Sequence, residues 1–351
     1  MSYSLKHKIG AMIYDLPQFV WAMRPARKTG ADGAPWVRYR NRNERLLIEP
    51  GQRGVACDWQ WTSDLHIAKV FPALGLRLMK RAFADWPITL QPKLEMQTAP
   101  ADVSFIIGHR GQARLPHLLL TLQSIAAQRG VTFECIVVEQ SARPEIQSAL
   151  PAWVRYVHTP LPQADMPYCR SWAFNVGAKM AQGALLVLHD NDLLVPSDYA
   201  AQLMKRFDEG YEVVNLKRFI FYLNEAHTGR MLATQQLLLN EAPEAIVQNA
   251  QGGGSIAIAR DAYFAIGGFD ESFVGWGGED NEFWERALTR RLWPYGYLPL
   301  VHLWHAAQPG KHDGQRQTAE LLEQLYAIPA SQRIANLIAQ NFASNYQHPS
   351  R

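Results

Sequence analysis

Between Val103 and Leu188, short apolar runs alternate with stretches of helical periodicity, and this alternation limits the possible folds more than any other feature. Four apolar runs have the length of strands buried on both faces, at residues 103–107, 133–138, 154–157 and 184–188. Two stretches between them have apolar residues at helical spacing, at residues 115–128 and 171–182. Alternation of this kind predicts an α/β fold, a mostly parallel sheet with helices on both faces.

The charge of the chain is divided between two regions. Residues 1–100 hold 15 Lys and Arg against 8 Asp and Glu, a net +7, and the remaining 251 residues hold 20 against 24, a net −4. The stretch 86–100 contains three prolines and is typical of a linker. At roughly 150 residues per domain, the chain length suggests about two domains. We therefore expect a basic N-terminal region over 1–100, the α/β domain over 101–315 and a C-terminal helical extension over 316–351.

Residues 66–83 have the pattern of an amphipathic basic helix, with leucines set against Lys69, Arg77, Lys80 and Arg81. This helix either packs on the next domain with its charged face in water, or contacts anionic lipid head groups or a lipid-linked acceptor. Binding of nucleic acid is a third interpretation. The basic residues do not form a recognised reading module, so we expect no nucleic-acid partner. A peripheral membrane contact through residues 66–83 stays open.

The cysteines and the apolar runs bear on the compartment. Cys57, Cys135 and Cys169 lie far apart, which excludes a disulfide framework and a cysteine-based zinc site and fits a reducing compartment. The first residues lead into no signal-peptide apolar segment, and no run approaches the ~18 apolar residues that span a bilayer. We expect a cytoplasmic protein, at most peripheral to the inner membrane.

Two carboxylates, Asp190 and Asp192, directly follow the apolar run 184–188. Residues i and i+2 of an extended chain point to the same side, and open α/β sheets bind ligands at the carboxyl ends of their strands. Divalent cations prefer oxygen ligands and are often completed by substrate phosphates. Turns are also rich in Asp, so the motif alone is weak evidence. Its position after a buried strand favours a metal and phosphate site.

A glycine-rich segment ends in Gly275-Trp-Gly-Gly-Glu-Asp280 and leads into a predicted helix. Glycines on both sides of Trp276 let the backbone bend while the indole ring is presented to a ligand. Acids at a helix N-terminus complement its dipole by ~0.3–1 kcal/mol, which explains one of Glu279 and Asp280 but not the Trp-Gly-Gly before them. The alternative is a general base with an acceptor-binding neighbour, both held on a rigid element.

Two imidazoles, His302 and His305, follow the apolar run 298–301. Residues three apart can share one face of a helix, or one can bind a ligand while the other packs. The Pro-Gly pair at 309–310 comes shortly after them. This arrangement suggests a ligand at the root of a lid.

With these motifs in order, residues 103–311, about 60% of the chain, resemble the GT-A glycosyltransferases. They are similar to the beta-1,4-galactosyltransferases and to the bacterial chondroitin-polymerase type of family 2 enzyme. The resemblance implies the GT-A fold, and it leaves residues 1–100 without a counterpart.

The resemblance also implies a nucleotide-sugar site. The first strand of the family ends beside the nucleotide, although Gly108 stands here where proline is usual. The acid after the second strand resembles the one that meets the uracil or ribose, and segment 168–177 resembles the family's Arg-x4-Asn-x-Gly helix beside the diphosphate. The nucleotide-sugar residues implied in this way are His109, Arg110, Glu139, Arg170, Asn175, Asp190 and Lys311.

A metal site follows from the same resemblance. Asp190-Asn-Asp192 falls on the family's D-x-D motif, whose second acid is the direct metal ligand. His305 falls on the metal-binding histidine, and His302 on a position that faces the metal in some members. The resemblance therefore implies Mn²⁺ or Mg²⁺ held by Asp192, His305 and His302.

The family's W-G-G-E-D motif matches the end of the glycine-rich segment. By resemblance, Trp276 is a mobile ring over donor and acceptor, Glu279 binds acceptor hydroxyls and Asp280 is the catalytic base. Asn281, also expected on the acceptor side, replaces a further acid of the galactosyltransferases, so their acceptor is not carried over. Related retaining enzymes, the polypeptide N-acetylgalactosaminyltransferases, have Asn at the position of Asp280, so an Asp there favours inversion.

The resemblance thus implies a metal-dependent inverting transfer of a sugar, from a UDP-sugar donor to a hydroxyl of a glycan or lipid-linked glycan, in bacterial surface polysaccharide synthesis. A nucleotidyltransferase on a similar sheet would also use Asp-held metals, but it has no need of the Trp-Gly-Gly-Glu-Asp loop. A non-catalytic carbohydrate-binding protein is expected to lack Asp192 or Asp280, and both are present.

Overall fold

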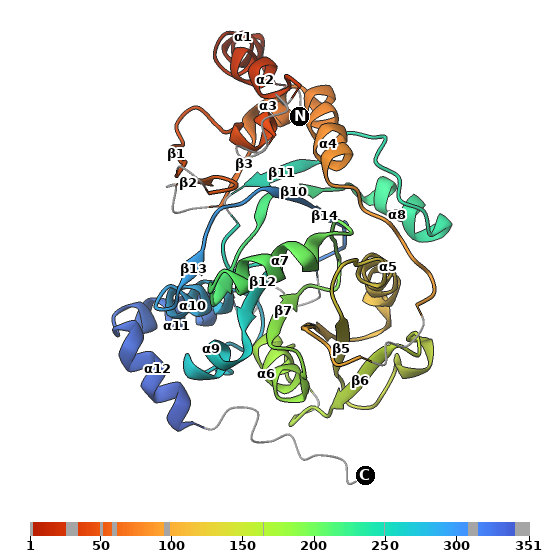
Figure 1. Cartoon of the computed structure of the whole chain (residues 1–351), viewed down its shortest axis with the longest axis vertical. Helices are drawn as coiled ribbons and strands as arrows, with labels where there is room; N and C mark the ends of the chain where they lie inside the picture. The colour runs from red at the N-terminus through yellow and green to blue at the C-terminus, as the bar shows by residue number, and fades with distance from the viewer. Residues whose placement is uncertain are drawn as a thin grey trace.

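The computed structural model describes residues 3–25, 34–49, 52–57, 62–94, 99–163, 165–248, 250–307 and 315–340. Its larger sheet has seven strands in the order β13-β9-β12-β7-β4-β5-β6 (Figure 1). β7, β4, β5 and β6 pair in parallel, and β12 runs antiparallel between β7 and β9. The predicted α/β fold with a mostly parallel sheet is confirmed. The strands are β4 (Val103–His109), β5 (Phe133–Gln140), β6 (Val154–Thr159), β7 (Leu185–His189), β9 (Val213–Val214), β12 (Ser255–Ala259) and β13 (Leu292–Trp293).

Helices cover both faces of this sheet because successive side chains of each strand point to opposite sides. Phe105 and Ile107 of β4 pack in one core cluster with α5 (Leu115–Ala126), whereas Ile106 packs in a second cluster with α6 (Arg170–Met180). The remaining helices of this part are α7 (Tyr199–Asp208), α8 (Glu225–Thr234), α9 (Arg260–Ala265) and α10 (Glu279–Ala287), with single turns η2 (Gln112–Arg114) and η3 (Gln147–Ala149).

A second sheet of five strands has the order β3-β11-β10-β14-β8. β10 and β14 are parallel, and the other pairs are antiparallel. Only residues 190–192 separate β7 of the first sheet from β8 of the second, so the Asp-Asn-Asp motif lies where the chain crosses between the sheets. The strands are β3 (Ser63–Asp64), β8 (Leu193–Leu194), β10 (Lys217–Tyr222), β11 (Ala245–Gln248) and β14 (Leu298–His302).

The basic N-terminal region packs on the second sheet, at the top of Figure 1. Its strand β3 pairs with β11 at the sheet edge, and the buried Arg218 of β10 donates hydrogen bonds to the carbonyls of Val37 and Tyr39. Trp36 and Leu65 are fully buried in the shared core. The elements of this region are α1 (Leu5–Tyr14), α2 (Leu16–Ala22), η1 (Pro35–Arg38), β1 (Leu46–Leu47), β2 (Ala56–Cys57), α3 (His66–Val70) and α4 (Pro72–Asp85).

The single helix expected over 66–83 is wrong, because the chain forms two helices there. Phe71 takes a non-helical conformation (φ −129°, ψ 83°), as expected for a residue before proline, and Pro72 starts α4. The apolar side of α4, including Leu78, Met79 and Phe83, is buried in the protein's own core. Residues 66–83 therefore present no such apolar face to a membrane.

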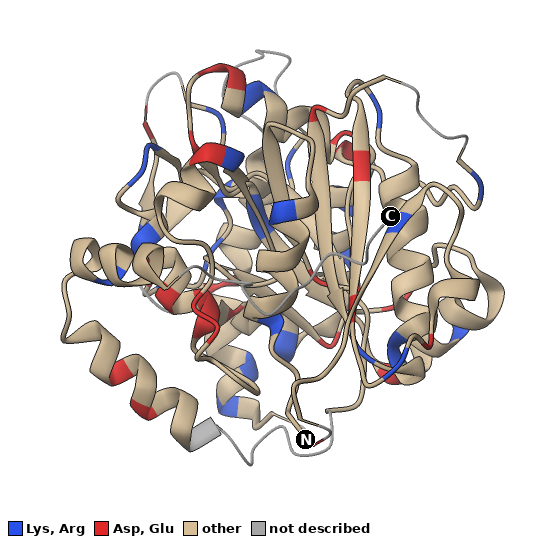
Figure 2. Cartoon of the chain, turned by 90° about the horizontal axis from the view of Figure 1, so that it is seen from below, with Lys and Arg blue, Asp and Glu red and all other residues tan. Residues whose placement is uncertain are grey.

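Charged residues of both signs are interspersed over the ribbon in Figure 2. The first residues of the stretch expected as a linker pack on the α/β domain, since Pro87 accepts a hydrogen bond from the backbone of Ser197 and Ile88 is buried. None of the three cysteines, all of which lie in the described residues, forms a disulfide. No helix in the described part of the chain combines the length and apolar character needed to cross a bilayer.

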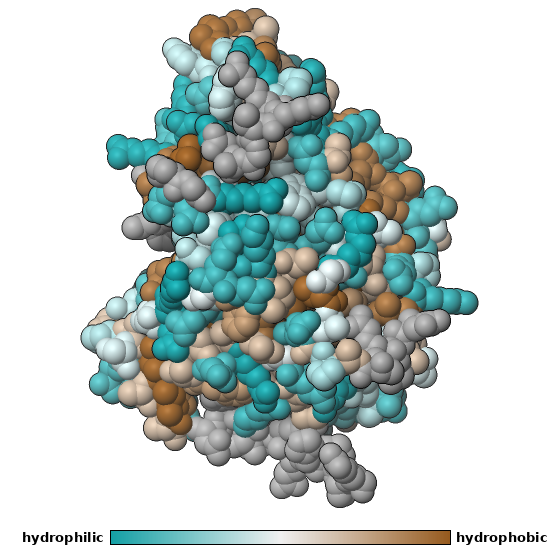
Figure 3. Space-filling model, viewed as in Figure 1, coloured by the Kyte–Doolittle hydropathy of each residue, from teal (hydrophilic) through white to brown (hydrophobic). Residues whose placement is uncertain are grey.

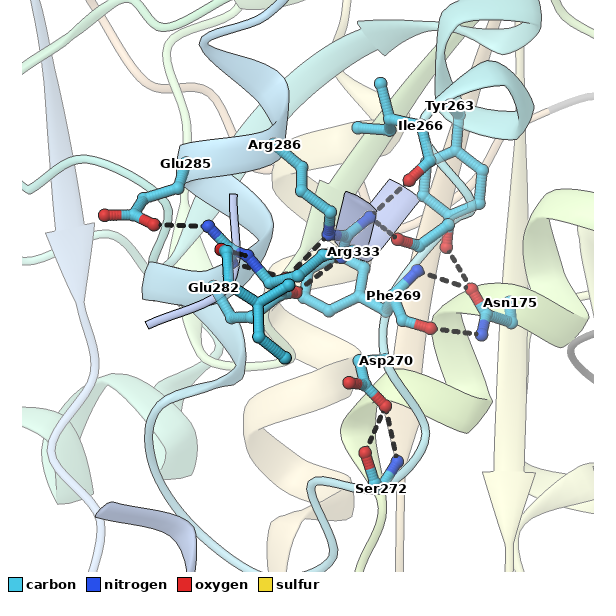
Figure 4. A network of polar contacts seen from close by, with 12 residues as sticks. Asn175, Tyr263, Ile266, Phe269, Asp270, Ser272, Glu282, Glu285, Arg286 and Arg333 are labelled. Atoms are coloured by element: carbon cyan, nitrogen blue, oxygen red, sulfur yellow. Dashed lines mark hydrogen bonds and ion pairs between the residues drawn. The ribbon is translucent and has the colours of Figure 1, made fainter. Parts of the chain in front are cut away.

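The described part of the C-terminal segment forms α11 (Gln315–Tyr326) and α12 (Ala330–Ala339). α12 packs beside α10 through a buried ionic network drawn in Figure 4. Glu282 of α10 binds Arg286 one turn later and Arg333 of α12, with N–O distances of 2.6 and 2.8 Å. Helix α10, whose first residues are Glu279 and Asp280, is thereby fixed from its far side.

Candidate active site

A cleft of about 1680 Å³ lies at the carboxyl ends of β4, β7 and β14. The sequence motifs that lead to it lie far apart in the chain, and parallel pairing of β4 with β7 brings the first two together. Most of the predicted site residues line this cleft. They are His109, Arg110, Arg170, Asp190, Asp192, Trp276, Glu279, Asp280, His302 and His305.

The candidate metal centre consists of Asp192, His302 and His305, whose ligand atoms lie within 4.8 Å of one another. Pairing of β8 with β14 sets His302 opposite Leu193, next to Asp192, and the Leu303 amide donates to the Asp192 carbonyl. His302 ends a strand and His305 lies in the following loop, so the two do not share a helical face. Nε2 of His305 is 3.3 Å and Nε2 of His302 3.7 Å from the Asp192 carboxylate.

These three residues fit a divalent cation. Oδ1 of Asp192 is buried and has no hydrogen-bond partner, an arrangement that is costly unless another ligand is supplied. One carboxylate with two imidazoles is a donor set that Mn²⁺ accepts, with room for substrate oxygens. Burial alone would raise the pKa of Asp192, but the neighbouring His302 and Arg114 hold that pKa below its ordinary value. The carboxylate is therefore ionised, as a metal ligand must be.

Arg170 links the other acids of the cleft. Its Nε and Nη2 donate to Oδ1 of Asp190 at 2.9 and 2.6 Å, and its Nη1 donates to Oδ1 of Asp280. The same Nη1 is 3.7 Å from Glu279. One guanidinium from α6 thus holds the Asp-Asn-Asp motif and the start of α10 in one arrangement.

Glu279 has an environment unlike that of Asp280. Its burial, followed by repulsion from Asp280, raises the pKa of Glu279 to about 7. Its Oε2 is buried without a hydrogen-bond partner. Near neutral pH a protonated Glu279 can donate a hydrogen bond to a ligand hydroxyl, a role that an ionised carboxylate lacks.

The glycines around Trp276 adopt the predicted bend. Gly275, Gly277 and Gly278 have φ of +96°, +102° and +93°, values that side-chain-bearing residues rarely take. The indole of Trp276 is 47% exposed and lines the cleft, as expected of a ring presented to a ligand. Gly278 caps α10, so Glu279 and Asp280 occupy its first turn.

Gly252 packs against the backbone of Asp280. A Cβ at this position would lie 2.4 Å from the Asp280 carbonyl oxygen, too close to be accommodated without movement. This contact gives Gly252 a specific reason to lack a side chain. It sets the start of α10 against the segment that leads into β12.

Glu139, Asn175 and Asn281 lie away from the lining of the cleft. The Glu139 carboxylate accepts hydrogen bonds from the amides of residues 145 and 146 and from Tyr156. Asn175 is buried and binds Tyr263 and Phe269 (Figure 4). It also donates a hydrogen bond to Glu271. Asn281 is exposed. Their predicted contacts with nucleotide or acceptor stay predictions, and Lys311 falls outside the described residues.

His109 and Arg110 line the cleft, and Arg110 also holds its neighbouring segments together. The Arg110 guanidinium binds the carbonyls of Gln140 and Met166, and burial lowers the pKa of His109 to about 4, so its imidazole is neutral. The packing around Gly108 explains why a glycine stands where the family usually has proline. A Cβ there would lie 2.1 Å from the Tyr168 hydroxyl, so the Tyr168 ring takes the space.

Several cleft residues lacked a sequence signal. Arg114 binds Asp192 at 2.7 Å, and the Tyr222 ring stacks on His302 with centroids 4.2 Å apart. Both lie at the site because of long-range packing, which a local sequence pattern does not predict. The N-terminal region adds Tyr3, Ser4, His7, Asp64 and Lys69 to the same lining.

Comparison with known proteins agrees with the motifs. Residues 112–265 match the family model described as Glycosyl transferase family 2, and residues 246–293 match the one described as N-terminal domain of galactosyltransferase. A chondroitin synthase from Escherichia coli is 24% identical in an alignment of 269 positions that covers 63% of this chain and 38% of the relative's length. The resemblance predicted from the motifs is confirmed.

Among solved structures, one match is the mannosyltransferase PcManGT from Pyrobaculum calidifontis in complex with GDP-Man and Mn²⁺. It has a TM-score of 0.41 and 17% sequence identity, over 79% of this chain and 84% of that chain.

Proposed function

We propose that this chain, which contains a family 2 glycosyltransferase domain, transfers a sugar from a nucleoside diphosphate sugar to a glycan hydroxyl with inversion at the anomeric carbon. The donor is a UDP-sugar, and the reaction depends on Mn²⁺ or Mg²⁺. One observation carries the proposal. The Asp192–His302–His305 cluster and the Asp280 carboxylate lie in one cleft, joined through Asp190 and Arg170.

The donor side of the reaction is assigned to the metal cluster. Asp192, His302 and His305 would hold the cation, which neutralises the charge of the departing diphosphate. Arg114, bound to Asp192 at 2.7 Å, adds positive charge beside it. The neutral His109 and the Arg110 guanidinium line the same cleft as the predicted nucleotide contacts.

The acceptor side is assigned to the start of α10. Asp280 takes the proton of the acceptor hydroxyl as that oxygen attacks the anomeric carbon from the face opposite the diphosphate. Its Oδ1 is occupied by Arg170, so we assign the proton to Oδ2. Glu279 binds a second acceptor hydroxyl, and Trp276 packs on a sugar ring.

The acceptor is proposed to be a surface polysaccharide or its lipid-linked precursor. The Escherichia coli relative is named for the synthesis of chondroitin, a polysaccharide. This chain spans 38% of that relative's length, so we do not assign the relative's full activity to this chain.

Donor binding tests the metal assignment. Calorimetry of UDP with the purified protein is expected to give binding with Mn²⁺ that EDTA abolishes. Asp192→Asn and His305→Ala are expected to lose it as well, because each removes a ligand. Asp198→Asn is the matched control, because the Asp198 side chain lies at the surface, where it pairs with Arg129. Equal UDP affinity with and without EDTA would contradict the metal site.

Transfer tests the base. A panel of UDP-, GDP- and dTDP-sugars with Mn²⁺ identifies the donor by hydrolysis, and Asp280→Asn is then compared at saturating donor. We expect Asp280→Asn to keep donor affinity and lose turnover by about 10²–10⁴-fold, the usual contribution of a general base. Near-normal turnover would remove that role. Release of pyrophosphate instead of UDP would favour the nucleotidyltransferase alternative.

A further inference from the structure

The helices α1 and α2 expose an unusual amount of apolar surface. Seven of the thirteen large apolar side chains that are exposed in the described residues lie on these two helices, which together have 17 residues. Leu5 and Ile13 are the most exposed of all, at 73% and 61%. Figure 3 shows this surface as brown at the top of the molecule, over α1. The seven are Leu5, Ile9, Met12, Ile13, Tyr14, Val20 and Trp21.

Four of these side chains form a stripe along one face of α1. Leu5, Ile9 and Met12 are spaced four and three residues apart, which places them on one face of α1. Ile13 continues this face, and Val20 and Trp21 are exposed on α2, which contacts α1. The opposite side of α1 carries the buried Ala11 that packs inward. A helix whose apolar stripe faces outward and whose small residue faces the protein is built to contact something else.

The charged residues around the stripe are mostly basic, which favours an anionic partner. Lys6 and Lys8 lie on either side of the stripe, both exposed, and Arg24 follows α2. Arg42 lies 4.9 Å from the centre of the Tyr14 ring and adds a fourth positive charge. The one acid of α1 and α2 and their junction, Asp15, is buried and binds His66 at 3.0 Å.

From this arrangement we propose that α1 and α2 dock on the surface of an anionic lipid bilayer. Leucine, isoleucine and tryptophan side chains enter the boundary between head groups and acyl chains, and the flanking lysines contact lipid phosphates. Lysine side chains at the edges of such a stripe reach outward with their ammonium groups while their stems stay apolar. The surface is distinct from residues 66–83, whose apolar side is internal.

Docking in this way would place the cleft beside the membrane. Tyr3, Ser4 and His7, at the start of α1, line the cleft, and the exposed stripe begins at Leu5. An acceptor sugar attached to a lipid could then reach Asp280 without leaving the bilayer surface. This last consequence rests on the proposed function, whereas the docking itself does not.

Vesicle flotation with the full chain tests the surface. We expect binding to phosphatidylglycerol-containing vesicles, weaker binding to phosphatidylcholine alone, and loss of binding as salt rises, because exposed charges are screened. The double substitution Ile9→Glu with Ile13→Glu is expected to lower partitioning by about tenfold or more. Lys6→Glu with Lys8→Glu is expected to lower it for the anionic vesicles alone.

Ile338→Glu is the matched control, since Ile338 is 53% exposed on α12 and outside the stripe. All substituted positions are exposed, so far-UV circular dichroism is expected to be unchanged. Vesicle binding that is absent, or equal in the wild type and the Ile9→Glu/Ile13→Glu variant, overturns the proposal. A lipid-free dimer that this variant dissociates also overturns it, because a second copy then covers the stripe. These readouts need no transfer activity, so a failed transfer assay leaves them intact.

Discussion

Nη1 of Arg170 donates a hydrogen bond to Oδ1 of Asp280, although the two residues are 110 positions apart in the chain. The remaining donors of the same guanidinium face Asp190. Only a planar fork with several donors can hold two carboxylates in this way. Arg170 is therefore a positioning residue for the proposed base as well as a predicted neighbour of the diphosphate.

Arg170→Lys is expected to lower kcat by about 10²-fold, because lysine keeps the charge but cannot hold both acids in register. Steady-state kinetics at saturating donor measure this effect. Arg129→Lys is the control, because Arg129 is largely exposed and pairs only with Asp198. An unchanged kcat in Arg170→Lys would mean that Asp280 is positioned by other contacts.

Gly252→Ala is expected to lower kcat, since a methyl group 2.4 Å from the Asp280 carbonyl must displace the start of α10. We expect a stability loss of about 1–3 kcal/mol, as for other overpacked sites. Gly229→Ala is the matched control. Nothing lies within 4 Å of a Cβ there and the residue is in α8, so alanine is expected to stabilise by about 0.5–1 kcal/mol. Urea unfolding together with kinetics separates the two effects, and equal behaviour of both variants would refute the packing argument.

The raised pKa of Glu279 leads us to expect that the stability of the protein depends on pH. Its pKa is raised from 4.5 to about 7 in the folded protein, so ionising it costs more when folded than when unfolded. The free energy of unfolding is therefore expected to fall as pH rises from about 4.5 to 7, by at most about 3 kcal/mol for this group. Glu279→Gln cannot ionise and is expected to lack this component. Urea midpoints of both proteins across this range check it, and parallel curves would contradict the raised pKa.

The Glu282–Arg286–Arg333 network predicts that α10 is braced by buried charge. Glu282→Ala is expected to destabilise by about 3–5 kcal/mol, because it leaves buried guanidinium groups without their anion. Arg230→Ala removes a surface pair with Glu241 and is expected to cost less than about 1 kcal/mol. Chemical denaturation compares the two. Similar small losses would show that water compensates the network.

The sequence patterns predicted much of the site because the motifs follow strands. Asp190 and Asp192 come directly after β7, and the Trp276 loop leads into α10, so both positions could be derived from local signals. The alternatives for His302 and His305 could not be decided locally. The pairing of β14 with β8 excludes a shared helical face and sets His302 beside Asp192, and the binding of a metal by either imidazole stays a prediction.

Other residues depended wholly on long-range packing. Arg114 and Tyr222 come from different parts of the chain and meet at Asp192 and His302 only in the folded protein. The exposure of the apolar face of α1 could not be predicted from the sequence either. The apolar pattern of residues 66–83 is as suitable for membrane contact as that of α1. The two segments differ in burial, since the apolar side of α4 is buried in the protein core.

By itself the sequence determined the alternation of strands and helices, the residues that follow each strand, and the glycine-bounded tryptophan before the two acids. These are local properties of side-chain pattern and backbone freedom. The tertiary structure alone decided which strand ends share a cleft, which acids Arg170 holds and which helix faces outward. Those outcomes depend on pairing and burial between segments far apart in the chain, and a local pattern does not specify its distant partner.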